Sequence, residues 1–222
     1  MPSHEKKKSR GLFVTFEGIE GSGKSSQLRR VADLLSRRNV AVLATREPGG
    51  TPLGTKVREL LLDFSGQVDR GAELLLMFAD RRQHLVEEIE PALARGVVVL
   101  CDRYTDASRA YQGAGRRLGE ETVDDLHRRF CQREPDRTYL FDCPVPVALA
   151  RLARRGDGNK DRIERENAAF HRRVRAAYRL RAASEPNRFR VLDATRSEDL
   201  VFEEIERDLN ALLARREMER AR

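Results

Sequence analysis

The strongest constraint on the fold of this chain is an eight-residue glycine-rich stretch, Gly18-Ile19-Glu20-Gly21-Ser22-Gly23-Lys24-Ser25. It fits the phosphate-binding pattern GxxxxGK[ST] at every fixed position. An apolar run typical of a strand precedes it at 12–16, and the residues that follow, 25–37, carry Leu and Val at helical spacing. The glycines therefore lie at a strand-to-helix turn, where backbone N–H groups and the positive end of a helix bind phosphate oxygens.

The same pattern predicts roles for individual side chains. Lys24 is expected to reach the β- and γ-phosphates of a nucleoside triphosphate, and the Ser25 hydroxyl to ligate Mg²⁺. A flexible glycine turn is the alternative, but chance rarely places all the fixed residues between a strand and a helix. The residues expected to form the phosphate site are Gly18, Ile19, Glu20, Gly21, Ser22, Gly23, Lys24, Ser25 and Ser26.

Length and composition predict one domain. The 222 residues, 40% of them hydrophobic, suffice for one α/β domain with a core, which we place at 11–212 between charged tails at 1–10 and 213–222. No apolar run approaches membrane-spanning length, so we expect a soluble, cytoplasmic protein without a membrane partner. The three cysteines lack metal-ligand spacing and are odd in number, which favours reduced thiols.

The net charge of +7 does not by itself indicate a nucleic-acid partner. The first ten residues carry a net charge of +3 and the last ten +2, so only +2 remains between them. The basic residues belong mostly to the tails, which we expect to be solvated and frayed. No recognisable DNA- or RNA-binding module accompanies them, so we expect no nucleic-acid binding.

Strand and helix patterns alternate along the chain, which is typical of a parallel sheet covered on both faces. We therefore predict an α/β, three-layer P-loop fold with a five-stranded parallel sheet, helices on both faces and a short lid. The predicted strands are 11–17, 40–45, 97–102, 137–142 and 188–193. The predicted helices are 24–38, 53–63, 71–95, 120–132, 146–155, 163–184 and 197–216.

Polar residues directly follow two of the predicted strands. Arg46 follows the second strand, Asp102 ends the third strand after its apolar run, and Arg103 follows it. Ligands bind at the carboxyl ends of strands in open α/β sheets, so we expect these residues to share one cleft with the phosphate loop. Asp102 suits the acidic partner of Mg²⁺, and the two arginines suit a second phosphorylated substrate. The alternative is that these residues form surface ion pairs, with Arg46 paired to Glu47.

Two further features each allow two interpretations. Phe78 and Arg82, four residues apart on one helix face, are either core and surface residues or a pair that stacks on a base and hydrogen-bonds its edge. The basic stretch 151–165, interrupted by Gly156-Asp157-Gly158-Asn159, is either a solvated helix end or a lid that closes over transferring phosphates.

Taken in order, these motifs resemble the thymidylate kinase family from about residue 11 to residue 212. The matching stretches are FEGIEGSGKS, TREPGGT, LLLMFADRRQ, DRY followed by AYQGAGR, PDRTYLFD and DRIE. The resemblance implies phosphorylation of dTMP to dTDP with ATP and Mg²⁺ in dTTP biosynthesis. It also implies a homodimer.

The resemblance also implies site residues. Asp102 would support the metal through water, while Arg46 and Arg103 would bind the dTMP phosphate. Phe78 would stack on thymine and Arg82 would donate to its carbonyl. The other implied contacts are Glu20 with the sugar 3′-hydroxyl, Tyr111 at the 2′ position, and Ser108 and Gln112 beside the base. Ala107 departs from the serine usual in the family, which affects fine contacts near the base.

Within the family, the chain resembles the bacterial-like branch with catalytic arginines in the lid. Gly21 stands where some members carry a basic residue in the phosphate loop. The arginines that stabilise the transferring phosphoryl group are then expected from the lid, as Arg151 and Arg155, with Arg154 a close third. Lys24 and Arg103 complete the predicted catalytic set.

Three rival functions share the phosphate loop. A kinase for another nucleoside monophosphate is the main one. A nucleic-acid-dependent ATPase would show hydrolysis stimulated by DNA or RNA. A regulatory GTPase would need NKxD, but Asn159-Lys160-Asp161-Arg162 has arginine at the position of the aspartate.

Overall fold

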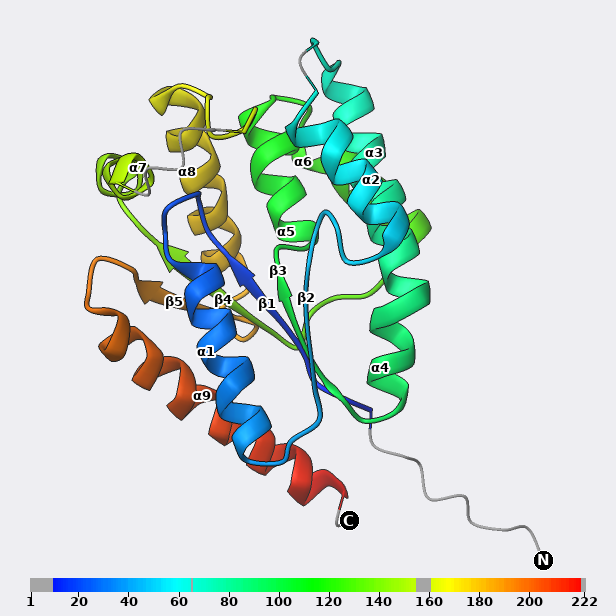
Figure 1. The fold of residues 1–222 in the computed structure, drawn as a ribbon, viewed down its shortest axis with the longest axis vertical. Helices are drawn as coiled ribbons and strands as arrows, with labels where there is room; N and C mark the ends of the chain where they lie inside the picture. The colour runs from blue at the N-terminus through cyan, green and yellow to red at the C-terminus, as the bar shows by residue number, and fades with distance from the viewer. Residues whose placement is uncertain (1–9, 65, 155–160, 221–222) are drawn as a thin grey trace, which may run out of the picture.

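The computed structural model describes residues 10–64, 66–154 and 161–220. Its centre is a parallel sheet of five strands in the order β2-β3-β1-β4-β5, which confirms the predicted fold class (Figure 1). The strands are β1 (Phe13–Glu17), β2 (Val42–Arg46), β3 (Val98–Asp102), β4 (Arg137–Asp142) and β5 (Phe189–Asp193). Each lies within two residues of its predicted bounds because the apolar runs mark buried strands clearly.

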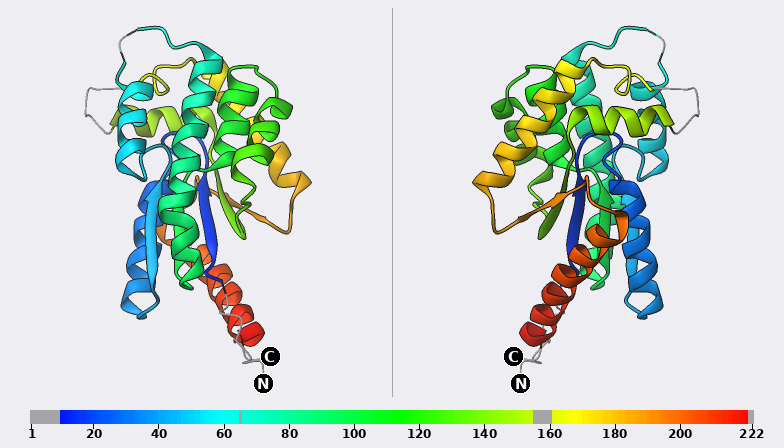
Figure 2. Two further views of the ribbon diagram at one scale, coloured as in Figure 1. Left: turned by 90° about the vertical axis from the view of Figure 1, so that its right-hand side faces the viewer. Right: turned by 90° about the vertical axis from the view of Figure 1, so that its left-hand side faces the viewer.

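Helices cover both faces of the sheet (Figures 1 and 2). On one face lie α1 (Lys24–Arg37) and α9 (Glu198–Arg220), which contact each other. The remaining helical elements are α2 (Pro52–Leu62), α3 (Arg70–His84), η1 (Leu85–Ile89), α4 (Glu90–Ala94), α5 (Thr105–Ser108), η2 (Arg109–Gly115), α6 (Glu120–Leu126), η3 (His127–Cys131), α7 (Val145–Arg154) and α8 (Ala168–Ser184). Among the described residues, none of these helices is long and apolar enough to cross a bilayer.

Alternate residues of β1 and β3 belong to two different hydrophobic clusters. In β1, Val14 and Phe16 belong to the larger cluster, which includes the apolar faces of α1, α8 and α9, whereas Phe13 belongs to the smaller one. In β3, Leu100 and Cys101 divide in the same way. This alternation follows from the two-residue period of a strand, and it fixes the register of the sheet against both helical layers.

Two predictions about helices need correction. No helix was predicted between 102 and 120, but α5 and the π-helical η2 form there, and η2 packs on α8. Their sequence carries two glycines and a few apolar residues, so tertiary packing rather than periodicity stabilises them. The predicted helix 163–184 begins later, at Ala168, where the Asn167 side chain accepts a hydrogen bond from the Phe170 N–H and caps the first turn.

The C-terminal helix extends into the charged segment that the sequence analysis expected to be frayed. Helix α9 continues through the described part of 213–222. Arg216 Nη1 donates to the carbonyl oxygens of residues 10 and 11 at 2.7 Å, and Nη2 pairs with Asp136 at 2.7 Å. The expectation of a frayed C-terminal tail is therefore wrong at Arg216, which ties the last helix to the entry of β1.

Candidate functional site

A cleft of about 1010 Å³ opens at the carboxyl ends of β1, β2 and β3. The phosphate loop forms one wall, and its backbone requires glycine. Gly21 has φ +75, and a Cβ there would lie 2.3 Å from the Ala148 carbonyl oxygen. Glu20, Gly21, Gly23, Lys24, Ser25 and Ser26 line the cleft. Of the other predicted loop residues, Gly18 and Ser22 do not line it, and Ile19 packs into the core.

The loop and β3 together form a polar pair suited to a cation. Ser25 Oγ donates to Asp102 Oδ2, so the predicted metal residues lie in contact. The other carboxylate oxygen, Asp102 Oδ1, is buried and accepts no hydrogen bond from the described residues. A buried carboxylate oxygen beside a hydroxyl matches the hard oxygen ligands that Mg²⁺ prefers, so these residues fit the predicted ion.

Lys24 lies buried beside this pair. Burial and the neighbouring Arg103 lower the pKa of its ammonium, although Asp102, Glu20 and Glu17 oppose that effect. Burial removes part of the hydration that stabilises the ammonium charge. A bound phosphate offsets this loss, because its negative charge stabilises the ammonium directly.

Arg103 links the phosphate loop to the far wall of the cleft. It adopts φ 73, which is rare for a residue with a side chain. Its Nη2 donates to Glu20 Oε1 at 2.7 Å, and its Nη1 donates to the Gly18 carbonyl at 3.0 Å. The guanidinium lies 4.7 Å from the centre of the Tyr111 ring, and the Tyr111 hydroxyl donates to Glu20 Oε2 at 2.7 Å. Four of the predicted site residues thus form one network.

Glu20 remains ionised in this network. Burial alone raises the pKa of its carboxyl, but Arg103 and Lys24 outweigh that effect, and the pKa lies below its usual value. An ionised carboxylate shared between the loop and Arg103 can accept hydrogen bonds from a hydroxylated ligand.

Arg46 ends β2, lines the cleft and makes no ion pair with any other described residue. The alternative pairing with Glu47 is wrong, because Glu47 is buried and pairs instead with Arg81 and His84. Arg58 also lines the cleft and was missed by the sequence analysis. Burial lowers its pKa, and Arg46 lowers it further. Two converging arginines form an anion subsite.

The predicted pair Phe78 and Arg82 lies outside the cleft. Phe78 packs into the smaller hydrophobic cluster, and Arg82 is exposed and donates to the Phe130 carbonyl at 3.2 Å. Their neighbours Met77 and Arg81 line the cleft instead. Met77 and Arg81 are also four residues apart, one position earlier on the helix, so the sequence offers two adjacent pairs that spacing alone does not distinguish.

Each of the three guanidinium nitrogens of Arg81 donates one hydrogen bond within the protein. The residue is 1% exposed, and its Nε donates to Glu47 Oε2 at 2.7 Å. Its Nη1 donates to Ser108 Oγ at 3.2 Å, and its Nη2 donates to the Tyr104 carbonyl at 3.1 Å. Ser108 and Gln112, both predicted site residues, line the same part of the cleft. Arg81 therefore joins three walls of the cleft.

The predicted lid is described only in part. Arg151 lines the cleft, and its Nη1 donates to the Ala194 carbonyl at 2.8 Å. Arg154 is exposed and does not line the cleft, whereas Arg155 lies outside the described residues. Near the end of the same stretch, Arg162 Nη2 donates to Glu73 Oε2 at 2.6 Å and its Nε donates to the Leu61 carbonyl at 2.9 Å. The described end of the stretch is therefore anchored to α2 and α3.

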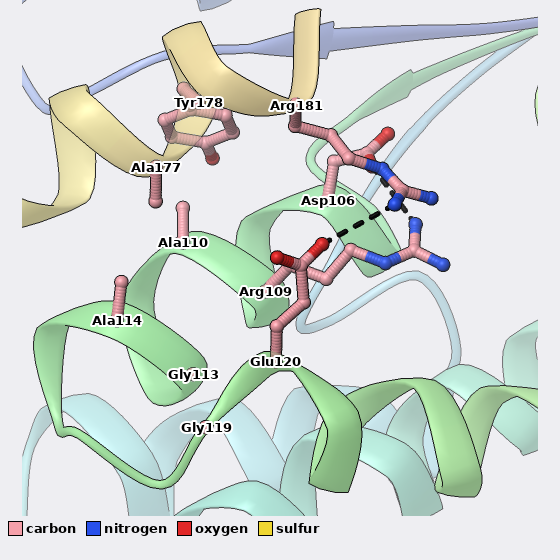
Figure 3. Close-up of a pocket in the computed structure, with 10 residues that line it drawn as sticks. All are labelled: Asp106, Arg109, Ala110, Gly113, Ala114, Gly119, Glu120, Ala177, Tyr178 and Arg181. Carbon is pink, nitrogen blue, oxygen red and sulfur yellow. Dashed lines mark hydrogen bonds and ion pairs between the residues drawn. The ribbon is translucent and has the colours of Figure 1, made fainter. Parts of the chain in front are cut away.

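A second cavity, of about 250 Å³, lies between η2, α6 and α8 (Figure 3). Small side chains such as Ala110 and Ala177 form part of its wall. Its charged residues neutralise one another: Arg109 pairs with Asp106 at 2.9 Å, and Arg181 with Glu120 at 3.3 Å. These charges are already compensated within the protein, so of these two cavities the larger cleft has the features of a phosphate site.

The fold and the larger cleft define a class. A phosphate loop opposite a second cluster of arginines, at the carboxyl edge of a parallel sheet, is the arrangement of a P-loop phosphotransferase that holds two phosphorylated ligands.

Comparison with known proteins specifies the family. The family model described as thymidylate kinase matches residues 16–205. Thymidylate kinases of Pseudomonas putida and Chromohalobacter salexigens are 52% and 51% identical to this chain, and each match covers at least 91% of this chain and 95% of the relative. The crystal structure of thymidylate kinase from Ehrlichia chaffeensis is 34% identical, with a TM-score of 0.73 over 90% of this chain and 99% of that one. The chain belongs to the thymidylate kinase family.

Glu17, which immediately precedes the phosphate loop, yields a prediction about stability. Burial, and then the charge of Asp106, raises the pKa of its carboxyl from 4.5 to about 8. Between those values the unfolded chain loses a proton that the folded chain keeps, so the free energy of unfolding falls as pH rises. Glu17→Gln, which cannot ionise, should therefore gain stability relative to the wild type as pH rises from about 5 to 8.

Urea unfolding of both proteins across this pH range measures the difference, and other titrating groups largely cancel in it. A difference that stays constant with pH would mean that Glu17 is ionised in the folded protein.

Proposed function

We infer that the cleft performs the reaction of its family, transfer of the γ-phosphoryl group of ATP to dTMP to give dTDP. The observation that carries this inference is a cleft with two anion subsites. The phosphate loop provides one, and Arg46, Arg58 and Arg103 provide the other. A binding switch or a simple ATPase needs only the first subsite, whereas a nucleotide kinase needs both.

The donor side of the cleft belongs to ATP. The loop amides and Lys24 bind its phosphates, and Ser25 and Asp102 hold Mg²⁺, which neutralises charge on the phosphates when it is bound. Arg151 lines the cleft from the lid side and is the described candidate for stabilising the transferring group. Arg154, which does not line the cleft, would have to approach when the lid closes, and Arg155 remains a further candidate.

The acceptor side belongs to dTMP. Arg46 and Arg103 bind its phosphate, joined by Arg58. Glu20 contacts the sugar 3′-hydroxyl, and Tyr111 crowds the 2′ position. Around the base, Met77 and Arg81 take the roles that the sequence assigned to Phe78 and Arg82, and Ser108 and Gln112 lie beside them.

Catalysis in this site is positioning and charge neutralisation. The acceptor is an ionised phosphate, so the reaction requires no strong general base. Arg103 reaches both the loop carbonyl of Gly18 and the acceptor wall, so it can hold the acceptor oxygens near the donor phosphates. Excluding water from the closed site prevents hydrolysis of ATP.

An acceptor panel tests this function. ATP consumption is measured with dTMP, dUMP, dCMP, dGMP, AMP, thymidine and single-stranded DNA. We expect dTMP to be the best acceptor, with residual activity on dUMP, because one methyl group is worth only about 1–3 kcal/mol. A strong preference for another monophosphate, or stimulation by DNA without any acceptor, contradicts the proposal.

The same assay shows which of Arg81 and Arg82 takes part in dTMP binding. Lysine keeps a positive charge but loses the planar fork of donors. Arg81→Lys should therefore lower kcat/KM for dTMP by about tenfold or more. Arg82→Lys, the matched control one residue away, should change it less than about twofold. Reversed effects would restore Arg82 to the site and remove Arg81.

We also propose a cytoplasmic homodimer. Three free cysteines fit a reducing compartment. Leu75 and Val86, separated by three helical turns along α3 and η1, are exposed on one stripe, and Arg82 links this stripe to exposed Phe130. Exposed apolar residues gathered across three elements fit a surface that a second copy covers.

Sedimentation velocity tests the dimer. Leu75→Glu places a charge at a side chain that is 60% exposed and should dissociate the dimer. Leu180→Glu, at a side chain on α8 that is 74% exposed, is the matched control and should leave the dimer intact. A wild-type monomer, or equal effects of both variants, contradicts this surface.

A further inference from the structure

One face of α3 contacts the loop that follows β2, residues 47–51. Asp80 and Arg81 lie four and three residues before His84, so both are neighbours of His84 on the helix surface. Asp80 Oδ1 accepts a hydrogen bond from the Gly49 N–H at 3.1 Å. His84 packs so closely on Gly50 that a Cβ there would lie 2.3 Å from the imidazole Nε2. The helix therefore determines where this loop can lie.

The buried carboxylate of Glu47 is the centre of the contact. One of its oxygens accepts from Arg81 Nε at 2.7 Å, and the other lies 3.0 Å from His84 Nδ1. His84 Nε2 lies 2.8 Å from the hydroxyl of Thr45. In the tautomer with hydrogen on Nδ1, the neutral ring donates to Glu47 and accepts from Thr45, so both nitrogens are satisfied.

His84, Glu47 and Cys101 lie close enough to hold a metal ion, but their contacts favour a hydrogen-bond network. Both Glu47 oxygens already have cationic or N–H partners. The Cys101 thiol donates to the Arg103 carbonyl at 3.0 Å, and burial raises its pKa well above the usual value, so it is not a thiolate ligand.

The residues that His84 supports belong to the acceptor side of the cleft. Thr45 and Glu47 flank Arg46 in the chain, and Glu47 also fixes Arg81. His84 itself does not line the cleft. His84 therefore acts, through Thr45 and Glu47, on the part of the cleft that holds Arg46 and Arg81. The phosphate loop that binds ATP lies on another wall.

We propose that His84 is a positioning residue for the nucleoside monophosphate, holding Arg46 and Arg81 in their binding geometry through Thr45 and Glu47. This role rests on the proposed function of the acceptor subsite. It predicts a selective effect: loss of the imidazole weakens dTMP binding but leaves ATP binding nearly unchanged.

The test compares two variants by calorimetry of dTMP binding and, separately, of binding of a non-hydrolysable ATP analogue. His84→Phe keeps an aromatic ring but removes both hydrogen bonds, and should raise the Kd for dTMP by about tenfold. His84→Asn keeps a donor near the position of Nδ1 and should give a smaller rise, of about threefold. In both variants the Kd for the ATP analogue should change less than about twofold.

His127 provides a matched control. It is also buried between a threonine and a glutamate, with Nδ1 3.0 Å from Thr105 Oγ1 and Nε2 3.1 Å from Glu134 Oε1, but none of these residues lines the cleft. His127→Phe should lower the Tm without a selective loss of dTMP binding. A selective loss in this variant would mean that any buried histidine produces the effect, and would overturn the assignment.

The outcomes distinguish this inference from the proposed function. Wild-type protein that fails to bind dTMP contradicts both. Wild-type binding together with unchanged binding in the His84 variants, or an equal loss for both nucleotides, contradicts only the role of His84. If His84→Phe does not fold, the ratio of the two Kd changes in His84→Asn decides the question.

Discussion

The register of the parallel sheet is the constraint on which the rest of the site depends. Asp102 at the end of β3 pairs with Arg46 of β2 on one side and with Phe16 of β1 on the other. Arg46, Asp102 and the start of the phosphate loop therefore lie side by side at one edge of the sheet. A slip of one residue in either pairing would turn these side chains to the opposite face and destroy the cleft.

On this edge, the ion pair between Arg103 and Glu20 makes the two subsites interdependent. Glu20 belongs to the phosphate loop, whereas Arg103 follows β3 and faces the acceptor wall through Tyr111. Because both groups are largely buried, each depends on the other for compensation of its charge. The loop thus does more than bind phosphates, since it also holds the arginine that would receive the second substrate.

The sequence predicted the features that depend on local pattern. The strands followed from apolar runs, the phosphate loop from fixed residues, and Arg46, Asp102 and Arg103 from their positions after strands. It could not choose between Met77 with Arg81 and Phe78 with Arg82, because both pairs have the same spacing and only packing against the rest of the chain separates them. Arg58 and the helix at 105–115 were missed for a related reason, since their placement depends on distant elements.

The central claim is that ATP and dTMP occupy one cleft with their phosphates facing each other at the phosphate loop. Binding of a single molecule in which adenosine and thymidine are joined by a chain of phosphates tests it most directly. The account predicts that this molecule binds more tightly than either nucleotide alone, and that ATP and dTMP each displace it. Displacement by only one of them, or no gain in affinity over the better nucleotide, would show that the two sites are not joined.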